Sequence, residues 1–139
     1  MEWLRYLTVG LVALFLLESR SRTLAADIRG WEPFRNESTL EVLTVDKNAR
    51  EHWSKFWLVV LDRQLYLRLG TRGAARINGN TKKPFVSIKI AGQRFDNVRV
   101  VQTPELTRAV AAAMAGKYWS DVIIRWFPHP MTVRLERSR

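Results

Sequence analysis

The pattern of apolar and polar residues between Leu40 and Leu69 predicts three strands, separated by one longer loop and one tight turn. These strands are Leu40–Val45, Phe56–Leu61 and Gln64–Leu69. The second is apolar at every position, which is typical of a strand covered on both faces, as in a closed or strongly curled sheet. In the third, leucines alternate with polar residues, so that Tyr66 and Arg68 share the face opposite the leucines.

The segment Asp46–Lys55, between the first two strands, is expected to be a polar and basic loop. It holds Lys47, Asn48, Arg50, His52 and Lys55, of which Lys47, Asn48 and Arg50 are the candidate binding residues. Asp62 and Arg63 form the tight turn before the third strand.

The second half of the chain predicts another hairpin, one principal helix and a closing strand. The hairpin strands are Phe85–Ile90 and Arg94–Val101, after a short helical turn within residues 74–80. Thr103 is expected to cap the helix, with Pro104 at its first position. An apolar segment at 122–127 precedes the strand at 131–135. This order predicts a mainly β fold of the α+β class, an antiparallel barrel with one helix packed on it.

The N-terminus carries an uncharged twelve-residue run, Tyr6–Leu17. A membrane span needs about 20 apolar residues, so this run fits the centre of a secretory signal, with cleavage after Ala25 or Ala26. An uncleaved membrane anchor is the alternative. Residues 1–26 are therefore interpreted as a signal peptide or anchor, 27–39 as a lead-in segment and 40–139 as the domain, which either alternative places outside the cytoplasm.

The composition indicates an anionic partner. The net charge is +10, and residues 1–27 hold three basic and three acidic residues, so the whole excess lies on the remainder. Such a charge suits a phosphorylated cofactor, a nucleic acid or an anionic membrane, although a solvated basic face would have the same composition. The chain lacks cysteine and has two distant histidines, so we assign no metal site and no catalytic residue.

A group of cationic and hydroxyl side chains is the main chemical signal. Its members are Lys47, Arg50, Arg68, Thr71 and Arg72, and this mixture favours phosphate. Trp57 and Tyr66 would flank a flat ring system. Tryptophans in a basic domain also suit single-stranded nucleic acid, but most aromatic residues here lie in apolar runs expected to be core, so nucleic acid is not favoured.

The order of these residues resembles the nitroreductase-like proteins of the flavin- and deazaflavin-binding split β-barrel group, related to pyridoxamine phosphate oxidase. The resemblance covers nearly all of residues 40–136. It is carried by the following matches: Leu43-Thr44-Val45 to a strand end, Asp46–Arg50 to a basic loop, Phe56–Val59 and Leu65–Arg68 to the next strands, Arg76–Asn80 to a turn, Val86–Lys89 with Ala91-Gly92 to a later strand and its glycine turn, Lys117-Tyr118 to the end of the helix, and Thr132–Leu135 to the closing strand.

The resemblance implies hydride transfer from a bound FMN or deazaflavin to a small electrophile such as a quinone or nitro compound. Lys47, Asn48 and Arg50 would hold the cofactor phosphate, with help from Arg68 and Thr71, and Trp57 or Tyr66 would line the ring pocket. Members of the group often form homodimers. Both glycines of the family loop are absent, and Asp46 stands in place of the first. A non-catalytic domain that has lost the cofactor is therefore the alternative.

Overall fold

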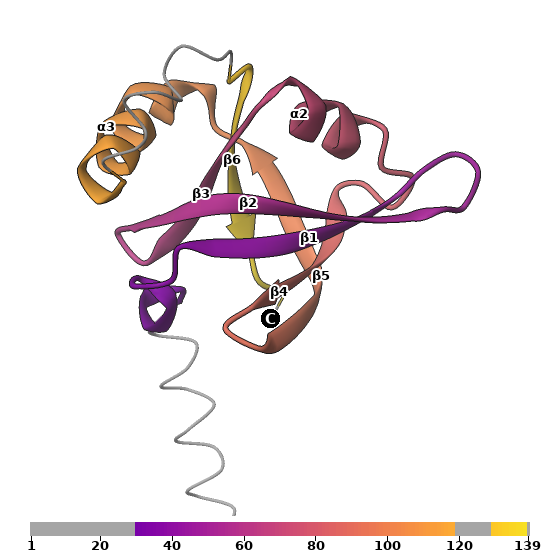
Figure 1. Ribbon diagram of the computed structural model, residues 1–139, viewed down its shortest axis with the longest axis horizontal. Coiled ribbons are helices and arrows are strands. Elements are labelled where there is room, and N and C mark those ends of the chain that lie inside the picture. The colour runs from indigo at the N-terminus through magenta and orange to yellow at the C-terminus, as the bar shows by residue number, and fades with distance from the viewer. Residues whose placement is uncertain (1–29, 119–128, 139) are drawn as a thin grey trace, which may run out of the picture. The chain divides into compact units, whose positions relative to one another are not determined.

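Six antiparallel strands close into a barrel in this computed structural model, which describes residues 30–118 and 129–138 (Figure 1). Around the barrel the order is β1-β2-β3-β6-β5-β4. The strands are β1 (Thr39–Val45), β2 (Glu51–Leu61), β3 (Gln64–Leu69), β4 (Phe85–Ile90), β5 (Gln93–Gln102) and β6 (Met131–Glu136). The helical elements are the 3-10 turns η1 (Glu32–Phe34) and η2 (Pro104–Leu106), with α-helices α2 (Thr71–Asn78) and α3 (Thr107–Lys117).

This architecture confirms the predicted fold class, a mainly β antiparallel barrel with a principal helix, α3. Trp31–Arg139 forms one compact unit. The expected N-terminal signal or anchor and the apolar segment at 122–127 lie outside the described residues. Within the part that is described, no helix is both long and apolar enough to cross a membrane.

The strand β2 begins five residues earlier than predicted. The prediction of a loop over residues 46–55 was therefore wrong, because residues 51–55 belong to the strand. The register of β1 on β2 runs without a break from Thr39 opposite Trp57 to Val45 opposite Glu51. His52 and Ser54 share the inward face of Leu58, and their polarity concealed the strand in the sequence. The connection shrinks to a tight turn at residues 46–50.

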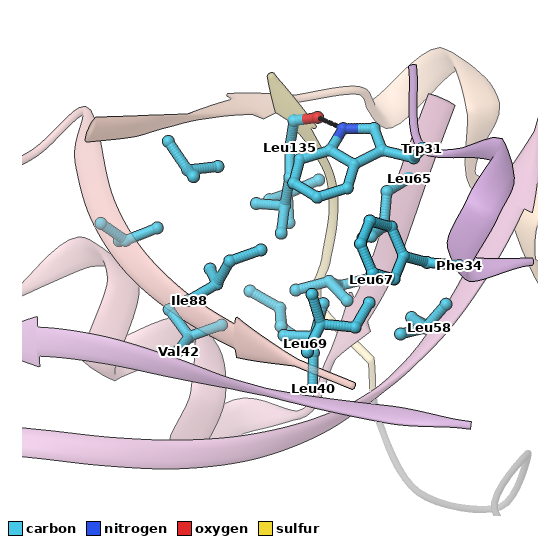
Figure 2. Packing of buried hydrophobic residues seen from close by; sticks show 14 of the residues in the cluster. Trp31, Phe34, Leu40, Val42, Leu58, Leu65, Leu67, Leu69, Ile88 and Leu135 are labelled. Carbon is cyan, nitrogen blue, oxygen red and sulfur yellow. Dashed lines mark hydrogen bonds between the residues drawn. The ribbon is translucent and has the colours of Figure 1, made fainter. Parts of the chain in front are cut away.

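The barrel interior is filled by aliphatic side chains and closed at one end by aromatic ones (Figure 2). The interior includes Leu40, Val42, Leu58, Leu65, Leu67, Leu69, Ile88 and Leu135, all 2% exposed or less. Trp31 donates a hydrogen bond from Nε1 to the carbonyl of Leu135, 2.7 Å away. Its ring meets Phe34 and Phe95 at tilted or edge-on angles. The expected packing of Trp31 and Phe34 onto the domain is therefore confirmed.

A second, smaller core lies between α3 and the outer face of β2 and β3. Val59 and Tyr66 pack there against Val110 and Met114 of the helix. The apolar run at 56–61 is thus covered on both faces, as predicted. The predicted helix start is confirmed in position, since Thr103 is the N-cap of η2 and Pro104 is its first residue. Thr103 makes no capping bond, however, and its buried hydroxyl donates to the carbonyl of Thr132 instead.

Candidate functional site

The turn between β1 and β2 holds three of the predicted phosphate-binding residues, and it is closed by its own backbone. The N–H of Asp46 donates to the carbonyl of Arg50 at 2.9 Å, and the N–H of Ala49 donates to the carbonyl of Asp46 at 3.0 Å. Ala49 adopts a φ of 59°, in the left-handed region. This geometry is that of a short hairpin loop that ends in a left-handed residue.

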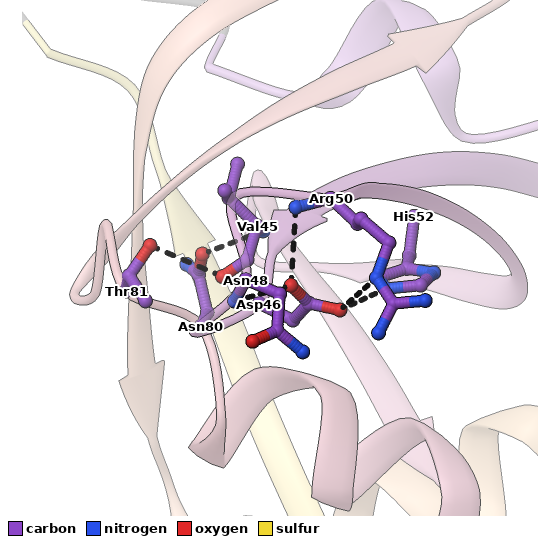
Figure 3. A network of polar contacts seen from close by, with 7 residues as sticks. All are labelled: Val45, Asp46, Asn48, Arg50, His52, Asn80 and Thr81. Carbon is purple, nitrogen blue, oxygen red and sulfur yellow. Dashed lines mark hydrogen bonds and ion pairs between the residues drawn. The ribbon is translucent and has the colours of Figure 1, made fainter.

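The Asp46 carboxylate occupies the centre of this turn (Figure 3). Oδ1 accepts hydrogen bonds from the backbone N–H groups of Asn48 and Arg50, at 2.8 and 3.0 Å. Oδ2 lies 2.9 Å from Nε2 of His52 and 3.6 Å from Nε of Arg50. The hydrogen bond from His52, followed by the backbone bond from Arg50, lowers the pKa of Asp46 from 3.8 to about 2. A carboxylate therefore already fills the place that an external anion would take.

The predicted binding residues in this turn have exposed side chains, but two of their backbone N–H groups are already hydrogen-bonded. Lys47, Asn48 and Arg50 are exposed, and the side chain of Arg50 is 71% accessible. The backbone donors of Asn48 and Arg50 are satisfied by Asp46, so a phosphate could not use them without displacing that carboxylate. The turn amides do not fit a cofactor phosphate, although the exposed cationic side chains remain able to contact one.

Asn80 fixes the base of the turn, a role that sequence reasoning missed. Its side chain is buried and accepts from the N–H of Val45 at 3.1 Å while donating to the carbonyl of Phe85 at 2.9 Å. Thr81 adds a backbone bond to the carbonyl of Val45. The signal in the sequence was an asparagine after Gly79, where a polar side chain bonds to nearby backbone groups.

The start of α2 brings together the other predicted phosphate residues. Arg68 ends the outer face of β3, and Thr71 is the first residue of the helix. Gly70 is the N-cap and has no side chain to bond the first-turn N–H groups. Thr71 and Arg72 are exposed. This donor set, a hydroxyl, a guanidinium and helix N–H groups, fits a phosphate, and the helix dipole adds to the attraction.

Gly73 sets the position of α2 on the barrel. A Cβ added to it would lie 2.6 Å from Cε1 of Phe56, so the helix backbone approaches the Phe56 ring more closely than any other residue would allow. Ala74 and Ile77 continue the buried face of the helix into the main core. The first turn of α2 therefore packs closely against Phe56 of β2, which fixes where its N-terminus lies on the barrel.

The two aromatic residues predicted to line a ring pocket are largely occupied by protein contacts. Tyr66 is 6% exposed beneath α3. The ring of Trp57 stacks on that of Tyr118, with centroids 5.2 Å apart and planes 16° apart. Trp57 lies six residues beyond Glu51, the first residue of β2, or about 20 Å from the β1–β2 turn at strand spacing. The predicted residues are thus spread between the turn, the start of α2 and the α3 face.

Lys117 and Tyr118 hold the end of α3 to the lead-in segment. Lys117 Nζ donates to the carbonyls of Arg35 and Leu58 at 3.0 and 3.3 Å. The Tyr118 hydroxyl lies 2.7 Å from the carbonyl of Ser38 and 2.6 Å from that of Leu58. Burial lowers the pKa of Lys117 and raises that of Tyr118 to about 12. A groove of about 530 Å³ lies beside these residues.

Comparison with known proteins identifies the fold and leaves the family open. No family model and no curated protein matches the chain. The heme storage protein HutZ from Vibrio cholerae has a similar structure, with a TM-score of 0.60 and 22% identity over 78% of this chain and 87% of that one.

Two further solved structures connect the fold with flavin and deazaflavin chemistry. An FMN-binding protein from Syntrophomonas wolfei has a TM-score of 0.57 and 14% identity over 95% of this chain and 94% of that one. An F420-H2 dependent reductase has a TM-score of 0.56 and 9% identity over 71% and 94%. The predicted split β-barrel fold is therefore confirmed, and the fold is one that flavin- and deazaflavin-dependent proteins use.

Proposed function

We propose that this barrel binds a flavin-type cofactor, FMN or a deazaflavin, and serves hydride transfer to a small electrophile such as a quinone or nitro compound. The observation that carries the proposal is the fold, which the chain shares over almost its full length with an FMN-binding protein. A shared fold alone does not determine function, so the argument also depends on the site residues.

The start of α2 is the place where the chain's own residues suit the cofactor phosphate. Thr71 would donate from its hydroxyl, Arg72 would supply a bidentate guanidinium, and the first-turn N–H groups would point at the same anion. Arg68 precedes them at the end of β3 and adds positive charge. When bound, a flavin-type cofactor supplies the hydride, so the protein itself needs no nucleophile or acid–base pair.

The β1–β2 turn would contribute through Lys47 and Arg50 alone, and Asn48 would offer only its side-chain amide. Asp46 engages the backbone N–H groups of Asn48 and Arg50, and its negative charge opposes the approach of a phosphate to them. Trp57 would contact the ring system only on the surface that Tyr118 leaves uncovered.

A non-catalytic domain on the same fold is the second candidate function. The specific observation in its favour is that Asp46 closes the turn that resembles a phosphate loop. In that case the barrel would retain a binding surface and lose the redox role. Both proposals include export or membrane anchoring through residues 1–26. Both also include a homodimer, which a solved domain-swapped dimer of similar fold supports.

Titration of the full chain with FMN and with the deazaflavin cofactor tests the proposal. We expect fluorescence quenching that saturates in the micromolar range or below, and turnover of a quinone or nitro compound when the cofactor is reduced. Arg72→Glu should weaken binding by about tenfold or more, because one guanidinium–phosphate interaction is replaced by repulsion. Arg108→Glu, on the exposed side of α3, is the matched control and should bind normally.

The outcomes separate the two candidate functions. Binding with turnover supports the oxidoreductase and excludes the non-catalytic domain. Absence of binding to both cofactors at tens of micromolar, in a chain shown to be folded, overturns the oxidoreductase.

A further inference from the structure

The segment Lys82–Phe85, which we call the basic ridge, presents apolar and cationic side chains together. Among the large hydrophobic residues in the described part of the chain, Phe85 is exposed, with 43% of its surface accessible. The other three residues of the ridge, Lys82, Lys83 and Pro84, are also exposed. A single exposed ring is common on protein surfaces, so it is the combination of this ring with the surrounding cations that points to an interaction surface.

Two hollows lie beside the basic ridge. One, of about 230 Å³, is lined in part by Leu43, Lys82 and Phe85. The other, of about 290 Å³, is lined in part by Ile77, Lys83 and Pro84.

The charge around the basic ridge is strongly positive. Residues 81–102, which include β4 and β5, carry five basic residues and one acidic residue, Asp96. Asp96 is engaged by Ser87 and Arg94, and these bonds keep its pKa below the usual value. Arg99 stands directly opposite Phe85 across the two strands. A cation therefore lies beside the exposed ring on the neighbouring strand as well as in the ridge.

These features favour an anionic lipid surface over other anionic partners. Single-stranded nucleic acid binds through several aromatic rings on which successive bases stack. The basic ridge offers the ring of Phe85, and the ring of Trp53 is already covered by Lys89 Nζ, 4.1 Å from its centroid. A second copy of the chain that docked here through the same basic face would be repelled, because like charges would meet. Lysines around an apolar residue match the interface of an anionic bilayer.

We propose that the basic ridge docks the barrel onto anionic membrane lipids. Pro84 and Phe85 enter the headgroup region, and Lys82, Lys83 and Arg99 contact the lipid phosphates. This proposal is independent of cofactor binding, because the start of α2 contributes none of these residues.

A single labelled cysteine tests the docking in the full chain, because the natural sequence has no cysteine to compete. Phe85→Cys, carrying an environment-sensitive fluorophore, is mixed with vesicles of phosphatidylcholine alone or with added phosphatidylglycerol. We expect a blue shift only with phosphatidylglycerol, reversed by high salt. The label reports its own surroundings, so membrane contact by residues 1–26 does not by itself produce the shift. The same label at Arg108→Cys on α3 is the control and should not respond.

Charge reversal in the ridge completes the test. Lys82→Glu with Lys83→Glu, in the labelled chain, should weaken vesicle binding by about tenfold or more, whereas Arg108→Glu should leave it unchanged. All variants change exposed residues, and circular dichroism confirms their folding. The proposal is overturned if the label at position 85 stays unshifted with phosphatidylglycerol vesicles, responds equally to neutral ones, or responds to a single-stranded oligonucleotide instead.

Discussion

The Asp46 carboxylate and the Arg50 backbone are joined twice: Oδ1 accepts from the Arg50 N–H at 3.0 Å, and the Asp46 N–H donates to the Arg50 carbonyl at 2.9 Å. An aspartate thus supplies the anion that the surrounding donors require. This arrangement explains how the turn keeps its shape without the two glycines of the phosphate loop that it resembles.

Removing this carboxylate should open the turn to phosphate. In Asp46→Ala, the N–H groups of Asn48 and Arg50 lose their acceptor and lie beside two cationic side chains. We expect inorganic phosphate to shift the amide resonances of Asn48 and Arg50 in this variant and to leave them in place in the natural chain. Equal shifts in both proteins would show that Asp46 does not close the turn.

The low pKa of Asp46 makes the stability of the turn pH-dependent. Its folded pKa of about 2 lies below the ordinary value of 3.8, so the carboxylate stabilises the fold above about pH 4. This contribution is lost as the pH falls from about 4 to about 2. Asp46→Asn keeps an acceptor oxygen but removes the charge, so its unfolding midpoint should converge with that of the natural chain at about pH 2. A constant difference between pH 6 and pH 2 would contradict this account.

Trp31 should contribute both packing and a hydrogen bond. Trp31→Ala removes a buried indole from the aromatic cluster and should cost about 3–5 kcal/mol of unfolding free energy. Trp31→Phe keeps an aromatic ring but leaves the Leu135 carbonyl without its 2.7 Å partner, at a cost of about 1–3 kcal/mol. Urea denaturation measures both. If the two variants were equally stable, the indole would not pack as described.

Asn80 should stabilise the fold through the hydrogen bonds of its side-chain amide and not through the volume that it fills. Asn80→Ala leaves the Val45 N–H and the Phe85 carbonyl without their side-chain partner, which should cost about 2–4 kcal/mol. Asn80→Asp keeps the acceptor for Val45 but turns a carboxylate oxygen toward the Phe85 carbonyl, so it should also destabilise. Asn78→Ala, an exposed position in α2, should change stability by less than about 0.5 kcal/mol. A small effect of both Asn80 variants would refute the role.

Tyr118 should ionise well above an ordinary tyrosine. Burial raises its pKa to about 12, so the neutral hydroxyl stabilises the fold up to about pH 10, and this contribution is lost as the pH rises through 12. Ultraviolet titration should show a late tyrosinate step that disappears in Tyr118→Phe. A late step that persists in that variant would assign it to another tyrosine.

Alternation made most of the barrel predictable from the sequence. The strand at 64–69 was predicted to the residue, because leucines and polar residues alternate there without exception. The first half of β2 was missed, since His52 and Ser54 face inward at the end of the barrel, where polar side chains are tolerated. The helix α2 was underestimated because Gly73 lowers helix propensity while serving close packing against Phe56.

The site was less predictable than the fold, because it depends on which side chains lie close together in space. Sequence order placed Lys47, Arg68 and Trp57 in one group, but strand length separates them along the barrel. The role of Asp46 could have been inferred, since an aspartate at the start of a tight turn commonly accepts from the N–H two residues later. Nothing in the sequence indicated that Trp57 would stack on Tyr118, 61 positions away.

The central claim is tested most directly by the absorption spectrum of the full chain. The spectrum is recorded first on the protein as purified from its native source, and again after incubation with excess FMN or deazaflavin cofactor. We predict a flavin or deazaflavin band that travels with the protein and is released in a one-to-one ratio on denaturation. A heme band, or no bound chromophore even after incubation, would contradict the account.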